Sequence, residues 1–269
     1  DDEYSGYNIA SYQEFLTLPK LINATFEYGD LVEESFPSTW TPGALAVEEI
    51  AFHQCHIDAG SVKKFMQACK KPKSFTYQNF TLDPRERRTP SMRTEPEFNA
   101  AQVHEAALLH KDTLEHFHVE FSRDPWDIDD LEKWLSSRIK FGSFRDFSKL
   151  DTIIVQHALL PVRPQLPASL ETLHVTDSNS SVRNLVQKIA ADCKNGHYPK
   201  LTEFKILAID ITQPIKLPGQ RVPSGQTPEQ CFLSLQNLFK GTKVEFHINP
   251  YKMPDFDDEY DDSDELDYE

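Results

Sequence analysis

The sequence lacks the features of a membrane-bound or secreted protein. No apolar run approaches the roughly 18 residues of a membrane-spanning helix, and the opening stretch DDEYSGYNIA has neither the basic nor the apolar region of a signal peptide. The four cysteines, Cys55, Cys69, Cys193 and Cys231, form no CxxC pair. Since this usage is typical of reduced thiols, we expect an intracellular protein of the cytoplasm or nucleus that has no membrane partner.

Motifs of the common enzyme classes are missing too. The sequence contains no GxxxxGK, GxGxxG or GxSxG, so it offers neither a phosphate-binding loop nor a nucleophile elbow. In HEAALLH (104–110) the second histidine follows the first by six residues, whereas the zinc proteases require four. We therefore expect no enzyme activity, no cofactor and no metal site.

Positive charge is scarce as well. The net charge is −15, and ten acidic residues without a base lie in DFDDEYDDSDELDYE (255–269). Such a segment repels itself and is predicted to be a disordered acidic tail behind a single domain, 1–254. Because no basic stripe is present to bind phosphates, nucleic acid is not expected as a partner.

A repeat is visible in VEEIAFHQCHI (47–57). Its residues Val47, Ile50, Phe52, Cys55 and Ile57 fit the leucine-rich-repeat pattern L-x-x-L-x-L-x-x-N/C-x-L. A metal or catalytic site at His53 and Cys55 is the competing interpretation, because alternate residues of a strand share one side. The repeat separates the two side chains: it leaves His53 on the exposed sheet and turns Cys55 inward beneath a loop.

The same pattern recurs along the chain with uneven fidelity. LDTIIVQHALL and LTEFKILAIDI match it well, whereas PKSFTYQNFTL and GTKVEFHINPY match it weakly; in the last of these Val244 and Phe246 take the fourth and sixth positions. Eight windows start near residues 21, 47, 72, 114, 150, 170, 201 and 241. Their spacing of 20 to 42 residues is less regular than the 20 to 29 of the better-known repeats.

Helical spacing of apolar residues occupies the intervals between windows. It is present in 61–71, 99–112, 129–139, 181–194 and 227–240, with Ser180 or Ser181 and Thr227 as N-caps of the last two. Two segments, 81–97 with four arginines and 213–228 rich in proline and glycine, are predicted to be inserted loops. Strands that alternate with helices predict an α/β solenoid, a horseshoe with parallel strands on the concave face and helices on the convex face. A doubly wound sheet of unrelated units is the alternative.

The chain resembles the leucine-rich-repeat region of fungal F-box proteins, which are substrate receptors of ubiquitin ligases. The resemblance rests on VEEIAFHQCHIDAGSVKKFMQACKKPKSFTY, HEAALLHKDTLEHFHVEF, FGSFRDFSKLDTIIVQHALL and LPASLETLHV and covers roughly residues 15 to 250. It implies a protein partner for the concave face and a ligase adaptor that binds an N-terminal F-box. No F-box segment is visible before residue 20, so the adaptor contact is expected only through a preceding segment, which the absence of an initial methionine suggests.

The repeat pattern also predicts which side chains face a partner. Positions three, five, seven and eight of each window lie on the concave face and hold His53, His116, His118, Glu120, Phe121, His157, His174 and His247. Tyr28, Ile154 and Ile248 are further apolar candidates on this face. Three interpretations of its histidines stay open: tolerated polar residues, a pH-tunable binding face, and a metal site centred on His116 and His118.

We therefore expect a non-catalytic protein-interaction module, which selects substrates for ubiquitination if an F-box accompanies it. This step from fold to function depends on the family resemblance. The alternative is a regulator of a small GTPase, since activating proteins of that kind join leucine-rich repeats to an acidic tail. Such a regulator would present an arginine at a repeat loop, and Arg163 and the cluster around Arg85 are the candidates.

Overall fold

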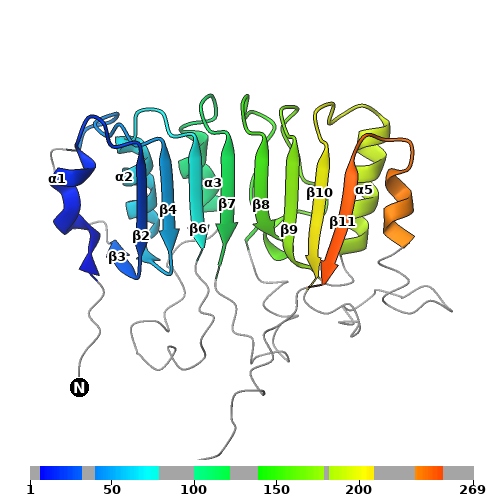
Figure 1. Cartoon of the computed structure of the whole chain (residues 1–269), viewed down its shortest axis with the longest axis horizontal. Coiled ribbons are helices and arrows are strands. Elements are labelled where there is room, and N and C mark those ends of the chain that lie inside the picture. Colours follow the sequence, from blue (N-terminus) through cyan, green and yellow to red (C-terminus); the bar gives the residue numbers. More distant parts are fainter. Residues whose placement is uncertain are drawn as a thin grey trace, which may run out of the picture.

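Eight strands form one parallel sheet in which spatial neighbours follow one another along the chain (Figure 1). The computed structural model describes residues 7–31, 40–78, 100–121, 139–178, 182–208 and 234–250. The strands of the sheet are β2 (Asn23–Glu27), β4 (Glu49–His53), β6 (Ser74–Gln78), β7 (His116–Glu120), β8 (Thr152–Gln156), β9 (Thr172–Ser178), β10 (Glu203–Ala208) and β11 (Glu245–Pro250). One strand thus lies at each of the eight windows predicted from the sequence.

The strands share one register from β2 to β10. Phe52 of β4, for example, pairs with Phe26 of β2 on one side and with Tyr77 of β6 on the other. All three residues are sixth positions of their windows, and the same correspondence continues through β10. Equivalent side chains therefore lie next to one another across the sheet.

The eighth window was placed two residues too early in the sequence. Phe204 pairs with Phe246, so Phe246 takes the fourth position and Ile248 the sixth, instead of Val244 and Phe246. A shift of two residues keeps residues 244–247 on their predicted faces, because the strand period is two. Ile248 is the exception: it was predicted to be exposed as an eighth position, but it becomes a sixth position and packs partly buried against the core.

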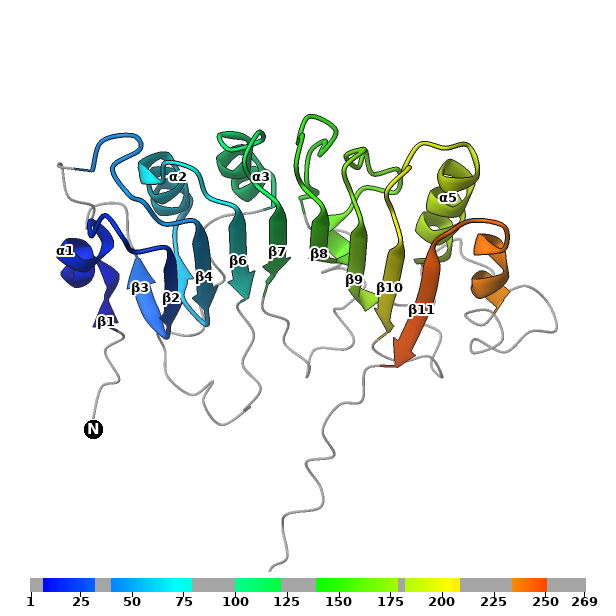
Figure 2. The same ribbon diagram turned by 45° about the horizontal axis from the view of Figure 1, so that its top comes forward.

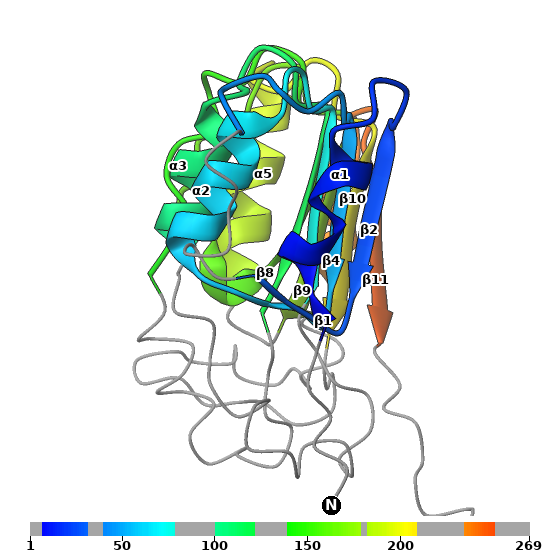
Figure 3. The ribbon, with the colours of Figure 1, turned by 90° about the vertical axis from the view of Figure 1, so that its left-hand side faces the viewer.

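Three helices cover one face of the sheet (Figures 2 and 3). They are α2 (Ala59–Ala68), α3 (Ala100–Leu108) and α5 (Arg183–Lys194). Asp58 caps α2 by accepting a hydrogen bond from the backbone N–H of Ser61 over 2.7 Å. The predicted apolar stripe of α2, which contains Val62, Phe65 and Met66, is buried against the sheet.

The helical layer is not continuous in the described residues. Between β8 and β9 the chain forms only the short 3-10 helix η6 (His157–Leu159) and turns. Pro161, Pro164 and Pro167 follow η6, and each removes a backbone donor that an α-helix would need. Before β8, residues 139–150 are also irregular, and the rings of Phe141, Phe144 and Phe147 fill the core there.

Aromatic rings run through the core beneath the sheet. Stacked pairs join Phe26 to Phe52 and Phe75 to Phe117, with ring centroids 5.1 and 6.1 Å apart. The leucines at the first positions of four windows, Leu114, Leu150, Leu170 and Leu201, are fully buried. Each such side chain contributes about 1.5–3 kcal/mol on burial. One cluster of buried residues extends from Leu16 to Phe246.

Short elements complete the described residues. Three short helices lie near the two ends of the described chain, and they are η1 (Ile9–Tyr12), α1 (Gln13–Leu16) and η8 (Asn237–Phe239). A second, three-stranded parallel sheet joins β1 (Tyr7–Asn8), β3 (Gly29–Leu31) and β5 (His56–Ile57). Large exposed apolar side chains gather near α1 and β2, namely Tyr12, Phe15, Leu18 and Ile22. Within the described ranges, the helices are too short or too polar to cross a lipid bilayer.

Several predictions concern residues outside the described ranges. These are the loops at 81–97 and 213–228, the tail at 255–269, the three N-caps and nearly all of the helix at 129–139. Of the helix predicted at 227–240, the described part begins at residue 234 with one helical turn that continues into η8.

Candidate binding face on the sheet

The side of the sheet opposite the helices carries the first, third and fifth residues of each strand, and we call it the outward face. Its composition follows from the period of two along a strand, which sends the intervening residues into the core. Helices α2, α3 and α5 all lie on the other side (Figure 3). Helices α2, α3 and α5 therefore do not cover the outward face, which makes it the candidate surface for a partner.

Histidine and glutamate dominate the ionisable side chains of the outward face. The glutamates are Glu27, Glu49, Glu120, Glu203 and Glu245, the histidines are His53, His116, His118, His174 and His247, and the lysine is Lys205. With neutral histidines this set carries five negative charges and one positive charge. The face is acidic at neutral pH.

Four of these histidines lie beside a carboxylate. The nitrogen to oxygen distances are 3.4 Å from His116 to Asp151, 3.0 Å from His118 to Glu120, 3.4 Å from His174 to Glu203 and 3.8 Å from His247 to Glu245. The remaining histidine, His53, pairs in register with Glu27 of β2. A proton taken up by any of these rings would be held next to an opposite charge.

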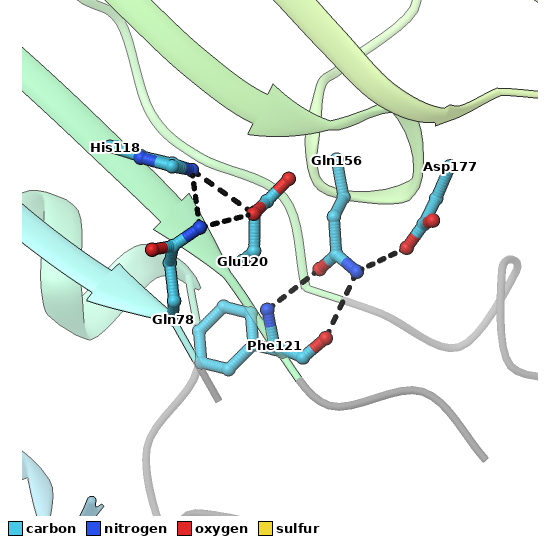
Figure 4. A network of polar contacts seen from close by, with 6 residues as sticks. All are labelled: Gln78, His118, Glu120, Phe121, Gln156 and Asp177. Carbon is cyan, nitrogen blue, oxygen red and sulfur yellow. Dashed lines mark hydrogen bonds and ion pairs between the residues drawn. The ribbon is translucent and has the colours of Figure 1, made fainter. Parts of the chain in front are cut away.

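A compact polar network lies at the carboxyl ends of β6 and β7 (Figure 4). The imidazole of His118 donates from Nε2 to Glu120 Oε2, and the side-chain amide of Gln78 donates to the same oxygen over 3.0 Å. Burial alone would raise the pKa of Glu120, but the hydrogen bonds from His118 and Gln78, together with the nearby hydroxyl of Thr176, outweigh burial and hold that pKa below its usual range. Glu120 is therefore a fixed negative charge on a partly buried part of the face.

A second network anchors the neighbouring strand ends (Figure 4). The buried side chain of Gln156 accepts a hydrogen bond from the backbone N–H of Phe121 over 2.9 Å and donates to the carbonyl oxygen of Phe121 over 3.0 Å. The same amide group donates to Asp177 Oδ2 over 2.5 Å. Gln156 thus ties the chain leaving β7 to the chain leaving β9.

The carboxyl ends of three strands turn through left-handed residues. Tyr28, Gln54 and Asp177 have φ values of 56°, 53° and 47°, and each is the eighth position of its window. A positive φ is energetically unfavourable for a non-glycine residue. Here it turns the chain away from the sheet at equivalent points of the three windows. At the next position, Cys55 accepts from the N–H of Gly29 at 3.5 Å and donates to the carbonyl of Phe26 at 3.4 Å.

His174 has a different environment from the other histidines of the face. Burial lowers the pKa of His174, the nearby Lys205 and His118 lower it further, and the carboxylate of Glu203, 3.4 Å from Nε2, opposes them. The pKa of Glu203 is held down chiefly by its hydrogen bond with Lys205, 3.1 Å away. These side chains meet at β9 and β10, in the C-terminal half of the outward face.

Six of the eight predicted partner-facing residues lie on the outward face: His53, His116, His118, Glu120, His174 and His247. The placement of Phe121 is wrong. Its ring is buried and packs against Tyr77, with ring centroids 5.7 Å apart. A large apolar ring at the end of a strand lowers its free energy by turning into the core.

The placement of His157 on the strand surface is also wrong. His157 begins η6 and is partly buried, and this burial, assisted by the charge of Lys140, lowers its pKa to about 4. The ammonium of Lys140 donates to the carbonyl oxygen of Ala158, within the same turn. His157 is therefore neutral at neutral pH and lies in a turn beyond the strand surface on which it was predicted.

Other predicted candidates are divided between the described and undescribed ranges. Tyr28 and Ile154 keep exposed surface. Arg163 is exposed in the turn after η6, whereas the cluster around Arg85 lies outside the described ranges. The described residues contain no group of three or more histidine, cysteine or acidic side chains placed to hold a metal.

Sequence reasoning missed Gln78, Gln156 and Thr176 as members of the site. Each is a seventh position of its window, and an alignment of the windows would have placed them in one row with Glu120. Comparisons with protein-family models, curated proteins and solved structures give no match for this chain.

Proposed function

We propose that this chain is a non-catalytic protein-binding module, a leucine-rich-repeat solenoid that holds a protein partner on the outward face of its sheet. The proposal depends on the common register of the strands, which places equivalent side chains in rows across a face that helices α2, α3 and α5 leave uncovered. Interlocked polar networks hold Glu120 and Gln156 in place, so part of the face is ordered before any partner arrives, and less entropy is lost on binding.

The resemblance to fungal F-box proteins specifies the proposal further. In a ubiquitin ligase receptor, the outward face would select the protein to be modified, and an adaptor would bind a separate F-box. A module of this kind needs no catalytic residue of its own. The buried thiols fit this role, since burial raises the pKa of Cys69 to about 12 and makes it a poor nucleophile at neutral pH.

Photo-crosslinking from the sheet surface tests the proposal. A benzoylphenylalanine at Ile154, which lies between His118 and His174 in one row, is expected to crosslink a discrete protein in an extract of the source cells. The matched control carries benzoylphenylalanine in place of Val162, which is 70% exposed in the turn after η6. Capture from both positions alike, or from neither, would contradict the proposal.

The ligase role requires a separate measurement. Mass spectrometry of proteins that copurify with the full-length gene product is expected to find the adaptor and cullin of the ligase. If the crosslink at Ile154 forms but neither ligase subunit is ever recovered, the protein-binding module stands and the ligase role is wrong.

A further inference from the structure

The charge of the outward face indicates what chemistry its partner has. The five glutamates are spread over β2, β4, β7, β10 and β11, so acidity extends from one end of the sheet to the other. Lys205 is the single lysine among the strand residues of this face, and Glu203 lies 3.1 Å from it. A partner that crosses the sheet therefore meets unbalanced negative charge along its path.

The size of the face suits an extended segment. Eight parallel strands at roughly 4.8 Å spacing make a surface about 34 Å wide. A polypeptide of about ten residues in extended conformation spans that width at 3.3 Å per residue. Polar side chains such as Thr25, Thr76 and Thr152, which lie between the acidic positions, leave room for long basic side chains to reach the carboxylates.

The same face loses its net negative charge within the range in which histidine titrates. With the histidines neutral, five carboxylates and one ammonium leave four negative charges. Burial lowers the pKa of His174, so protonation of the other four histidines adds four positive charges and leaves the face without net charge. Histidine is the side chain that makes this change between pH 5 and 8.

Charged side chains surround each of the five histidines, and they determine where a bound proton would be held. The charged neighbours are Glu27 for His53, Asp151 for His116, Glu120 and His174 for His118, Glu203, Lys205 and His118 for His174, and Glu245 and Lys205 for His247. Carboxylates thus flank every one of the five rings. On protonation, each ring neutralises a carboxylate that a basic partner would otherwise contact.

We infer that the outward face binds a basic, extended polypeptide segment at neutral pH and releases it when the face histidines become protonated. This inference rests on the proposed function and names the partner class and the regulation of the same face. Binding follows from charge complementarity across the sheet, and release follows from internal His–carboxylate pairs that replace the carboxylate–partner pairs. No further element has to move.

Fluorescence anisotropy with a rhodamine-labelled decalysine peptide tests this inference on the full chain. At fixed low ionic strength, the dissociation constant is expected to rise roughly tenfold between pH 7.5 and pH 5.5. Decaglutamate is the probe of opposite charge and is not expected to bind at pH 7.5. The lysines of the probe and most carboxylates keep their charge over this interval, so the change reports the histidines.

The acidic tail at 255–269 also attracts a basic peptide, and matched variants separate its contribution. Glu203→Gln combined with Glu245→Gln removes two charges from the face, while Glu14→Gln combined with Glu105→Gln removes two from exposed helical positions. The first pair is expected to weaken binding severalfold more than the second. Equal weakening would show that the tail or the total charge governs binding, and would overturn the inference.

Histidine variants test the release step. His116→Asn combined with His247→Asn, both about half exposed, is expected to reduce the pH dependence while circular dichroism shows an unchanged fold. His197→Asn, in the exposed turn after α5, is the control and is expected to leave the dependence unchanged. A pH dependence that is equal in all three proteins would overturn the release step. If decalysine does not bind but the crosslink at Ile154 forms, the partner class is wrong and the protein-binding function remains.

Discussion

The imidazole ring of His104 occupies the space that a side chain at residue 142 would need. A Cβ atom added to Gly142 would lie 2.8 Å from both Cε1 and Nδ1 of that ring. The ring cannot easily withdraw, because its Nε2 contacts the carbonyl oxygen of Ser143 at 3.0 Å and its edge meets Phe144 at a centroid distance of 4.9 Å. Helix α3 is thereby fixed to the irregular segment before β8.

Gly142→Ala is therefore expected to lower the free energy of unfolding. Overpacking of a filled core costs about 1–3 kcal/mol, and urea denaturation measures the change. The His104→Ala background is the control, because it removes the ring that the new methyl group would meet. If Gly142→Ala costs the same in both backgrounds, the contact with His104 is not the cause.

Gln156→Glu is expected to destabilise the protein more than its nearly identical shape suggests. The carboxylate would still accept from the N–H of Phe121, but it could no longer donate to the carbonyl of Phe121 or to Asp177. Buried like charges and an unsatisfied carbonyl together cost about 2–4 kcal/mol. The melting temperature of Gln156→Glu at pH 7.5 measures this loss.

Acidification distinguishes the electrostatic cause from simple misfit in the same variant. Protonation of either carboxyl group would restore a donor and remove the repulsion, so the gap in melting temperature between Gln156→Glu and the unmodified protein is expected to narrow as the pH falls from 7.5 to 5. Gln156→Ala, which places no charge there, is the control and should show no narrowing.

The stability of the protein is expected to fall as the pH decreases from about 6.5. Burial lowers the pKa of His104, of His110 and of His157, the last to about 4. Each group binds its proton more readily in the unfolded chain, where its pKa is ordinary, so acidification favours unfolding. The stability from neutral histidines is fully present above pH 6.5 and declines below it, because the folded pKa lies lower than the unfolded one.

His157→Gln is expected to reduce this slope. The residue contributes on the order of 1–3 kcal/mol between pH 6.5 and its folded pKa, and urea denaturation at pH 7.5, 6 and 5 measures how much of the slope depends on it. His197→Gln, in an exposed turn, is the control. Parallel stability curves for His157→Gln and the unmodified protein would contradict the role assigned to His157.

The parallel sheet and its helices were predictable because their signals are local. Alternation in LETLHV places Leu173 and Val175 on one side of a strand, and the 3.6-residue spacing in 181–194 buries Leu185 and Ile189 on one side of a helix. Both signals come from side chains close together in the sequence. The positions of the strands from β2 to β10 and of helices α2, α3 and α5 were accordingly confirmed.

The errors arose where local patterns are ambiguous. Val244 and Phe246 fit the window as well as Phe246 and Ile248 do, since a shift of two residues leaves the strand period unchanged. Only the pairing of Phe246 with Phe204 resolves the position. The network around Glu120 and Gln156 also depends on contacts between residues up to 42 apart in the sequence. Unequal intervals between windows conceal which polar residues become neighbours.

The thiols of Cys69 and Cys193 are expected to resist alkylation in the folded protein. Burial raises the pKa of Cys69 to about 12, and burial with the adjacent charge of Asp192 raises the pKa of Cys193 to about 11. Because the thiolate is the reactive species, iodoacetamide at pH 7.5 should leave both unlabelled over a time in which the urea-unfolded chain is fully labelled. Peptide mass spectrometry identifies the labelled positions.

The two thiols should then differ as the fold is loosened. Cys193 lies on α5 with part of its side chain exposed, whereas Cys69 is 2% exposed at the end of α2. Labelling of Cys193 needs only local fraying of one helix, while labelling of Cys69 requires the core beneath β4 to open. In a urea series below the unfolding midpoint, Cys193 is therefore expected to react first. Simultaneous labelling of both would show that α5 has no independent opening and unfolds only with the whole core.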